Sequence, residues 1–412
     1  MKDDQMAIPH LFRCPISLDL FTDPVTLCTG QTYDRSNIEK WLAAGNLTCP
    51  VTMQRLHDRS LVPNHTLRHL IDQWLLMNHC FDPDHLKAID PDLSLVPLKH
   101  NLESNEVTLT TKIETLEKLG NLSKDLTWRS GLIQLGFFPL LLRLLFVNTG
   151  SRQSNLVQDD SAFAEQALTC ILNMLSFSQL GYLDMLKEES HVASFLVLLD
   201  QGNTKVKTSL CLMVEAIASS SETKQLSVML GKTRNLLQGL VILLHHNSET
   251  SDAAVKAISA LCSVELNQEN VVEEGGVDGL IAYISTGNTR EASTALATLE
   301  LLLGLESGKK AALSNIHAVN ALVKMVFRVY DREGNESAVS TLLILCYDSL
   351  RVREEALSVG VLTQLLLLIQ SQCTYRAKSK AKVLLKLLRS MWAEDPSACK
   401  VVQHGVVDRC LC

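Results

Sequence analysis

The sequence predicts a mostly helical protein, in which a small α+β module precedes a solenoid of helical repeats. Three observations support this fold class. The 412 residues are rich in Leu, Ala, Val and Ser but only 5% aromatic, which favours helices packed on helices over a β-sandwich. Turn-forming dipeptides crowd residues 8–78. From residue 107 to residue 412 the apolar residues follow a helical period.

These patterns divide the chain into three zones. Residues 8–78 form the compact module, with room for two short helices between the turns. We expect the first of these helices to begin at Ser36, because Glu39 follows three residues later as in a capping box. Residues 79–106 contain three prolines and little periodicity, which is typical of a linker. Residues 107–412 form the repeat domain.

Apolar blocks recur along the repeat domain at a nearly constant interval. The anchoring leucines lie 56, 44, 40, 42, 43 and 46 residues apart: Leu140, Leu196, Leu240, Leu280, Leu322, Leu365 and Leu411. A period of ~40–47 residues built from two or three helices is typical of armadillo and HEAT repeats, whose units bury their apolar faces only against their neighbours. A glycine before several blocks suits a tight turn between helices. We therefore predict about six repeats.

Charge and cysteine usage exclude several classes. A net charge of −7 argues against a dedicated nucleic-acid-binding protein. No uncharged apolar run reaches the ~18 residues of a membrane span, and charged residues follow Met1 directly, unlike a secretory signal. The twelve cysteines include no C-x-x-C pair, so we expect reduced thiols. We expect a cytoplasmic protein, with the periphery of the plasma membrane and the nucleus as alternative locations.

Two short motifs in the module each look like half of a zinc knuckle. Cys14-Pro15-Ile16-Ser17 and Cys49-Pro50-Val51-Thr52 carry a hydroxyl residue where the second cysteine of a knuckle would stand. The intervening metal-ligand positions of a RING domain hold side chains that are neither Cys nor His, whereas a structural zinc site needs four such ligands. We expect no metal and no cofactor. Instead, we predict a network of hydrogen bonds among Cys14, Thr29, Gln31, Asp34 and Asn37.

The module resembles the U-box of the plant ubiquitin ligases that carry armadillo repeats. The motif positions that carry the resemblance span about 65 residues and are Pro9, Phe12, Cys14, Pro15, Asp23, Pro24, Gly30, Tyr33, Trp41, Leu42, Cys49, Pro50, Pro63, Asn64 and Trp74. The repeats extend the resemblance over nearly the whole chain. The resemblance implies a ubiquitin transferase that forms no covalent intermediate. The U-box binds a ubiquitin-charged conjugating enzyme and orients its thioester toward a substrate lysine. The partners are then that enzyme, ubiquitin and a protein substrate on the armadillo groove, with a U-box dimer as a further expectation.

In this family the conjugating enzyme docks on a shallow apolar groove. The matching positions are Ile16, Leu18, Trp41 and Pro50. A few apolar or aromatic anchors suit a small, transient interface. The alternative is that all four belong to the core of the module, Leu18 most readily.

One position departs from the family pattern. Many such modules place a cationic linchpin just after the second loop, where this chain has Met53. A guanidinium offers five donors and a thioether none. Our hypothesis is therefore an active but modestly activating ligase. The alternative is a non-catalytic armadillo adaptor whose U-box is inactive.

A basic stripe marks the last repeat. Lys378, Lys382 and Lys386 are four residues apart and share one helix face. This stripe is either a solvated face or a dock for an acidic or phosphorylated partner or an anionic membrane. The chain lacks the Trp/Asn ladder of importin-type arrays, so we do not expect it to carry nuclear-import cargo. The resemblance suggests plant stress, immune or hormone signalling.

Overall fold

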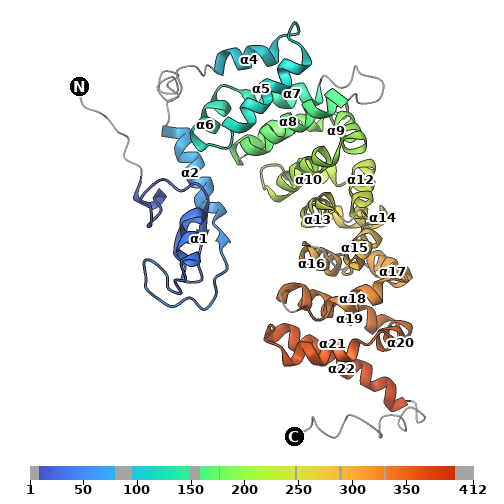
Figure 1. The fold of residues 1–412 in the computed structure, drawn as a ribbon. Coiled ribbons are helices and arrows are strands. Elements are labelled where there is room, and N and C mark those ends of the chain that lie inside the picture. Colours follow the sequence, from blue (N-terminus) through green and yellow to red (C-terminus); the bar gives the residue numbers. More distant parts are fainter. Residues whose placement is uncertain are drawn as a thin grey trace. The chain divides into compact units, whose positions relative to one another are not determined.

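The computed structural model describes residues 9–78, 95–147, 158–175, 177–245, 248–286, 290–328 and 331–394. These residues are mostly helical, with one small sheet near the N-terminus, which confirms the predicted fold class (Figure 1). Contacts divide the chain into two compact units: Met1–Leu145 with Ala162–Tyr182, and Phe146–Ser161 with Leu183–Cys412.

A three-stranded antiparallel sheet lies in the N-terminal module. Strand β1 (Pro24–Thr26) pairs with β2 (Thr32–Asp34) on one side and with β3 (Val62–Pro63) on the other. Val25 lies opposite both Tyr33 and Pro63. The 3-10 turn η1 (His10–Phe12) and helices α1 (Arg35–Ala43) and α2 (His65–Asn78) complete the module.

Helix α1 begins at a different residue from the one predicted. Asp34 holds the N-cap position, and Ser36 lies inside the helix, where its hydroxyl donates to Asp34 Oδ1 at 3.1 Å. The predicted N-cap at Ser36 is therefore wrong. The helix starts earlier because strand β2 runs directly into it at Asp34.

The module encloses a small core. Its buried members come from both loops, the sheet and both helices, and they are Cys14, Phe21, Val25, Leu27, Tyr33, Ile38, Cys49 and Ile71. Half-buried side chains, among them Trp41, pack around this cluster. Tyr33 and Cys49 bring polar atoms into the cluster, so each of those atoms needs a partner inside it.

Part of the predicted linker is helical. Residues 95–103 form helix α4 (Leu95–Glu103), in which Leu95 and Leu102 are buried. Pro97 sits in the first turn of this helix, where a missing backbone N–H costs no intrahelical hydrogen bond. The linker prediction is therefore wrong for residues 95–103, and residues 79–94 lie outside the described part of the chain.

Helices continue from α4 through the rest of the first unit and into the second. They are α5 (Leu109–Leu122), α6 (Leu126–Gln134), α7 (Phe137–Phe146) and α8 (Gln158–Met174). No single described helix is long and apolar enough to cross a membrane. Two consecutive segments, Trp128–Gln134 and Phe137–Phe146, are together long and apolar enough, but the chain bends by 68° between them.

The second unit repeats a pattern of three elements. The 3-10 segment η3 (Phe177–Lys187) leads into α9 (Glu189–Gln201) and α10 (Thr204–Ser219). Four helix triplets follow: α11 (Lys224–Leu230), α12 (Arg234–Leu244), α13 (Glu249–Cys262); α14 (Glu265–Glu273), α15 (Gly276–Ser285), α16 (Ala292–Leu302); α17 (Glu306–Ser314), α18 (Ala318–Met325), α19 (Arg332–Asp348); and α20 (Leu350–Ser358), α21 (Val361–Gln370), α22 (Tyr375–Glu394).

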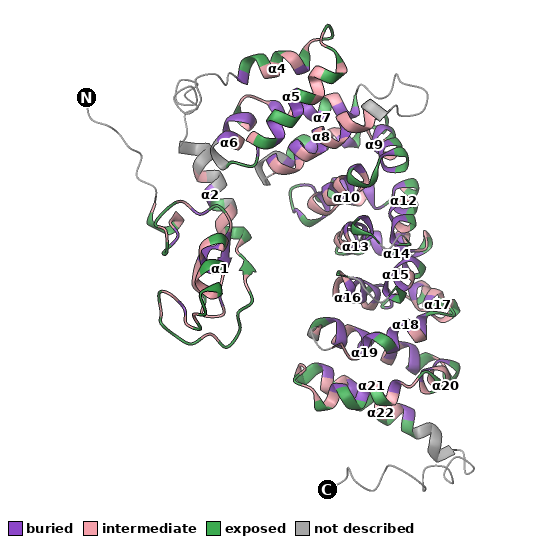
Figure 2. Cartoon of the chain, viewed as in Figure 1, coloured by how far each residue is buried: buried purple, intermediate pink, exposed green. Residues whose placement is uncertain are grey.

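Equivalent helices of successive repeats contact each other. The third helices α10, α13, α16, α19 and α22 form one row, and the second helices α9, α12, α15, α18 and α21 form another (Figure 1). Buried residues gather where these helices meet (Figure 2). The predicted anchors Leu240, Leu280, Leu322 and Leu365 are fully buried in the second row, as expected of units that bury their apolar faces against neighbours. The predicted anchor Leu411 lies outside the described residues.

Glycine makes the turn before two of these second helices. Gly275 and Gly360 precede α15 and α21 with φ values of 86° and 89°. This left-handed conformation is costly for residues with a Cβ. The predicted role of glycine at these turns is confirmed.

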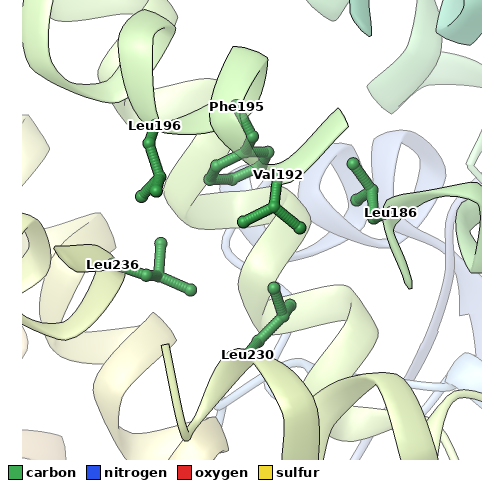
Figure 3. A pocket seen from close by; sticks show the side chains of 6 residues that line it. All are labelled: Leu186, Val192, Phe195, Leu196, Leu230 and Leu236. Atoms are coloured by element: carbon green, nitrogen blue, oxygen red, sulfur yellow. The ribbon is translucent and has the colours of Figure 1, made fainter. Parts of the chain in front are cut away.

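Apolar side chains fill the joint between two successive repeats. Six side chains from η3, α9, α11 and α12 converge in Figure 3: Leu186, Val192, Phe195, Leu196, Leu230 and Leu236. The space between them holds no water-sized void. The joint is therefore packed core that stabilises the stack, not a ligand site.

Candidate functional site

The two knuckle-like loops of the module share one backbone arrangement. In the first loop the Cys14 carbonyl accepts a hydrogen bond from the N–H of Leu18 at 2.8 Å, and in the second the Cys49 carbonyl accepts from Met53 at 2.9 Å. Each cysteine N–H donates in turn to the carbonyl five residues on, that of Asp19 or that of Gln54. The two loops are far apart in the sequence, yet each is closed by the same two backbone hydrogen bonds.

The residue at the turn of each loop adopts an uncommon conformation. Leu18 and Met53 have φ values of 63° and 57°, in the left-handed region that residues with a Cβ seldom adopt. The two residues are 64% and 67% exposed. The hydroxyls of Ser17 and Thr52 accept from backbone N–H groups two residues on, each at 3.4 Å. The hydroxyl residue that replaces a knuckle cysteine therefore supports the loop from within.

Hydrogen bonds to a cysteine sulfur hold the first loop against the start of α1. Cys14 Sγ accepts from the backbone N–H of Asp34 at 3.3 Å and from Asn37 Nδ2 at 3.8 Å. The Asp34 carboxylate accepts from the backbone N–H of Thr22 at 2.6 Å, from the Thr22 hydroxyl at 2.7 Å and from the N–H of Asp23 at 3.1 Å. Burial tends to raise the pKa of Asp34, but these hydrogen bonds outweigh it and lower the pKa below its ordinary value.

Tyr33 holds the second loop in an equivalent way. Its hydroxyl oxygen accepts from the N–H of Val51 at 3.1 Å and lies 3.0 Å from Cys49 Sγ. Burial raises the pKa of Tyr33, so the phenol keeps its proton and can donate it to the sulfur. Burial tends to raise the pKa of the Cys49 thiol too, but the neighbouring hydroxyl groups of Thr29, Thr52 and Tyr33 lower it to about 6.

The structure brings together three of the five residues predicted to form the polar network. Cys14, Asp34 and Asn37 are directly linked. The buried Thr29 hydroxyl makes no hydrogen bond of good geometry, and Gln31 contributes its backbone carbonyl, which accepts from Leu27. Among the residues that the structure describes, no three Cys, His, Asp or Glu side chains gather as metal ligands.

Sequence reasoning missed the part played by Tyr33. An aromatic residue in a short strand is read as core, and Tyr33 is indeed fully buried. The sequence did contain one indication of this role, the phenol group itself, because a buried Tyr hydroxyl usually finds a hydrogen-bond partner.

The four predicted docking residues differ in exposure. Ile16 is 38% exposed and Pro50 half-buried. The alternative that placed Leu18 in the core is wrong, because the left-handed turn projects its side chain into solvent. Trp41 packs against the module core, and its indole N–H donates to the carbonyl of Thr48 at 2.9 Å. Val51, which the prediction did not include, occupies the position in the second loop that Ile16 occupies in the first and is 51% exposed.

The predicted basic stripe lies on α22. Lys382 and Lys386 are exposed and Lys378 is half-buried, while Ala377, Ala381, Leu384 and Leu388 form the buried side of the helix. The neighbouring Lys380 points elsewhere: its Nζ lies 3.4 Å from Glu336 and 3.6 Å from Glu300.

Comparisons with known proteins cover nearly the whole chain. The family model described as the U-box domain matches residues 8–80, and the one described as the plant U-box protein ARM repeat region matches residues 98–403. U-box domain-containing protein 26 of Arabidopsis thaliana is 34% identical, over 95% of this chain and 94% of that protein. E3 ubiquitin-protein ligase PUB23 of the same plant is 26% identical, over 96% of each. A designed armadillo repeat protein in complex with a (KR)4 peptide matches 61% of this chain and 99% of its own at 18% identity, with a TM-score of 0.44.

Proposed function

This chain belongs to the plant U-box proteins with an armadillo-repeat region, and we propose that it is a ubiquitin ligase. Its U-box binds a ubiquitin-charged conjugating enzyme, and its repeats hold the protein substrate. The observation that carries the proposal is the pair of matching loops, each fixed through a cysteine sulfur and each projecting exposed apolar side chains.

The chemistry required of such a module is orientation. A U-box forms no covalent intermediate, so it accelerates transfer by restraining the thioester near the attacking lysine. That role needs loops with a fixed position. Here the Cys14 sulfur accepts hydrogen bonds from neighbours in β2 and α1, and the Cys49 sulfur is hydrogen-bonded to the Tyr33 hydroxyl in β2. These bonds fix the loops where zinc does so in a RING domain.

The linchpin position supports a modest degree of activation. Met53 is exposed at the turn of the second loop and presents a thioether that cannot donate a hydrogen bond. A conjugating enzyme and its ubiquitin would therefore be bridged less firmly than by an arginine at this position.

Cellular role and location belong to the same proposal. Its relatives are plant U-box proteins, and on this basis we place the protein in plant stress, immune or hormone signalling, acting in the cytoplasm. Proximity labelling with a Trp41→Ala variant, which should hold substrates without modifying them, would identify the pathway. Labelled proteins unrelated to any of these processes would contradict the assignment.

The decisive experiment is self-ubiquitination by the purified full chain with a panel of conjugating enzymes. Ile16→Ala removes an exposed anchor, and Leu18→Asn removes another while keeping a residue that tolerates the left-handed turn. Each should lower the rate about tenfold, as expected for an interface anchor worth over 1 kcal/mol. Leu266→Ala, an exposed leucine of the repeats, is the matched control.

The outcomes separate the two candidate functions. Equal rates in the wild type and both loop variants would remove the proposed docking surface. An inactive wild type with every conjugating enzyme would favour the non-catalytic adaptor. Trp41→Ala is less suitable here, because its indole also holds Thr48 and contacts the core.

The basic stripe of α22 is proposed as a dock for an anionic partner. Lys382→Glu with Lys386→Glu reverses the two exposed charges without touching the buried side of the helix. Binding to vesicles that contain phosphatidylserine should then fall, since each basic residue near such a surface contributes about 1 kcal/mol. Unchanged binding would mean that the stripe is a solvated face.

A further inference from the structure

An open cavity of about 500 Å³ lies along the row of third helices. Its walls come from α10, α13 and the start of α16, and most of the lining side chains are charged or hydroxylic: Glu215, Ser219, Lys256, Ser259, Ser263 and Glu291. Small-molecule sites are mostly apolar and enclosed. This cavity is polar and open, so it suits a segment of polypeptide better than a small ligand.

Charge in the cavity is unbalanced. Lys256 Nζ forms an ion pair with Glu291 at 3.0 Å. Glu215 accepts no hydrogen bond and touches no cation among the described residues. Two carboxylates therefore share one ammonium group. Burial raises the pKa of Glu215, and Glu291 raises it further, while Lys256 acts in the opposite direction. Glu215 thus lies in a partly dehydrated place that favours an added positive charge.

The same row shows how a lysine fits between two glutamates. Lys380 of α22 reaches Glu336 of α19 at 3.4 Å and Glu300 of α16 at 3.6 Å. There the chain supplies a cation that contacts both carboxylates. In the cavity, Lys256 lies within ion-pair distance of Glu291 but not of Glu215. Among the described residues, therefore, no cation pairs with Glu215 as Lys380 pairs with both of its glutamates.

We propose that Glu215 receives a lysine or arginine side chain of a bound polypeptide, so that the third-helix face selects extended segments with a basic residue at one position. The hydroxyls of Ser219, Ser259 and Ser263 lie in the same cavity and can bond the backbone of such a segment. The segment counts as substrate only if the ligase function proposed above holds. A phosphorylated segment fits less well, because Lys256 is already paired and the cavity carries net negative charge.

The test uses the full chain and an immobilised library of extended peptides with randomised positions. The wild type should enrich Lys and Arg at one position. Glu215→Gln should lower that enrichment roughly tenfold or more, the loss expected for one charge-assisted hydrogen bond. Glu215→Lys should invert the preference toward Asp and Glu. Glu222→Gln, an exposed glutamate outside the cavity lining, should keep the wild-type preference.

Three results would overturn the inference: no basic preference in the wild type, an unchanged preference in Glu215→Gln, or enrichment of acidic residues by the wild type. Thermal unfolding of each variant shows that it is folded. Self-ubiquitination of the wild type, assayed on the same preparation, separates the two proposals. Its absence alongside a basic preference overturns the ligase function alone, and its presence without that preference overturns the role of Glu215 alone.

Discussion

Removing one oxygen atom should release the second docking loop. Tyr33→Phe keeps the buried ring but deletes the hydroxyl that lies 3.0 Å from Cys49 Sγ and accepts from the N–H of Val51 at 3.1 Å. Val51 precedes Met53 in the loop that also carries Pro50. The substitution therefore tests whether hydrogen bonds to a sulfur and an amide fix this loop.

The magnitude follows from the two lost bonds. A net contribution of about 1 kcal/mol for each, with a further penalty for leaving a backbone N–H unpaired, gives a cost of about 2–3 kcal/mol. Since about 1.4 kcal/mol corresponds to a factor of ten, the loop should open about 30 to 140 times more often.

Hydrogen exchange of the Val51 amide in the full chain measures this opening directly. We expect exchange to accelerate by that factor in Tyr33→Phe, with a matching decline in self-ubiquitination. Tyr347→Phe, which removes the same atom from an exposed tyrosine of α19, should leave Val51 unaffected. If Val51 exchanged at the wild-type rate in Tyr33→Phe, the hydroxyl would not be holding the loop.

Three further perturbations probe the module and the repeats. Because the pKa of Asp34 is lowered in the folded state, its carboxylate stabilises the module above the unfolded pKa of about 4, and that stability is lost as pH falls through the lower folded value. Asp34→Asn should thus destabilise the module, measured by hydrogen exchange, at neutral pH but hardly at strongly acidic pH; an equal cost at both would refute the linkage. Leu236→Ala, at a position only 1% exposed, should lower the free energy of unfolding by about 2–5 kcal/mol in chemical denaturation, whereas Ile242→Ala on the same helix, 59% exposed, should change it by less than about 0.5 kcal/mol. Met53→Arg should raise the rate of ubiquitin-chain synthesis by supplying the missing donors, and an unchanged or lower rate would contradict the proposed role of this position.

The repeat register could be predicted from the sequence because solenoid packing is local. Each unit contacts only its neighbours, so the spacing of buried leucines such as Leu240, Leu280 and Leu322 is preserved along the chain as a period. The turns at Gly275 and Gly360 could also be predicted because their cause is local. The left-handed backbone conformation there favours a residue without a Cβ. The matched C-P-x-S/T motifs likewise indicated two equivalent loops.

Side-chain contacts between distant segments could not be predicted in this way. The sequence left open whether Leu18 lies in the docking groove or in the core of the module, and the left-handed backbone at that residue exposes it. Ser36 fitted a capping box, but Asp34 takes the cap position while its carboxylate also bonds Thr22. Each outcome depends on which groups meet across the fold.

By itself, the sequence of this protein determined its fold class, its repeat period and the pairing of its two loops, because each of these follows from spacing along the chain. Only the tertiary structure decided that Tyr33 and Asp34 fix those loops through Cys49 and Cys14. It also decided that Glu215 faces an open cavity in which no cation of the described residues lies within ion-pair distance of it. The physical reason is that a hydrogen bond or an ion pair requires two groups within a few ångströms, and residues far apart in the sequence reach that distance only through the packing of the whole module or the whole row of helices.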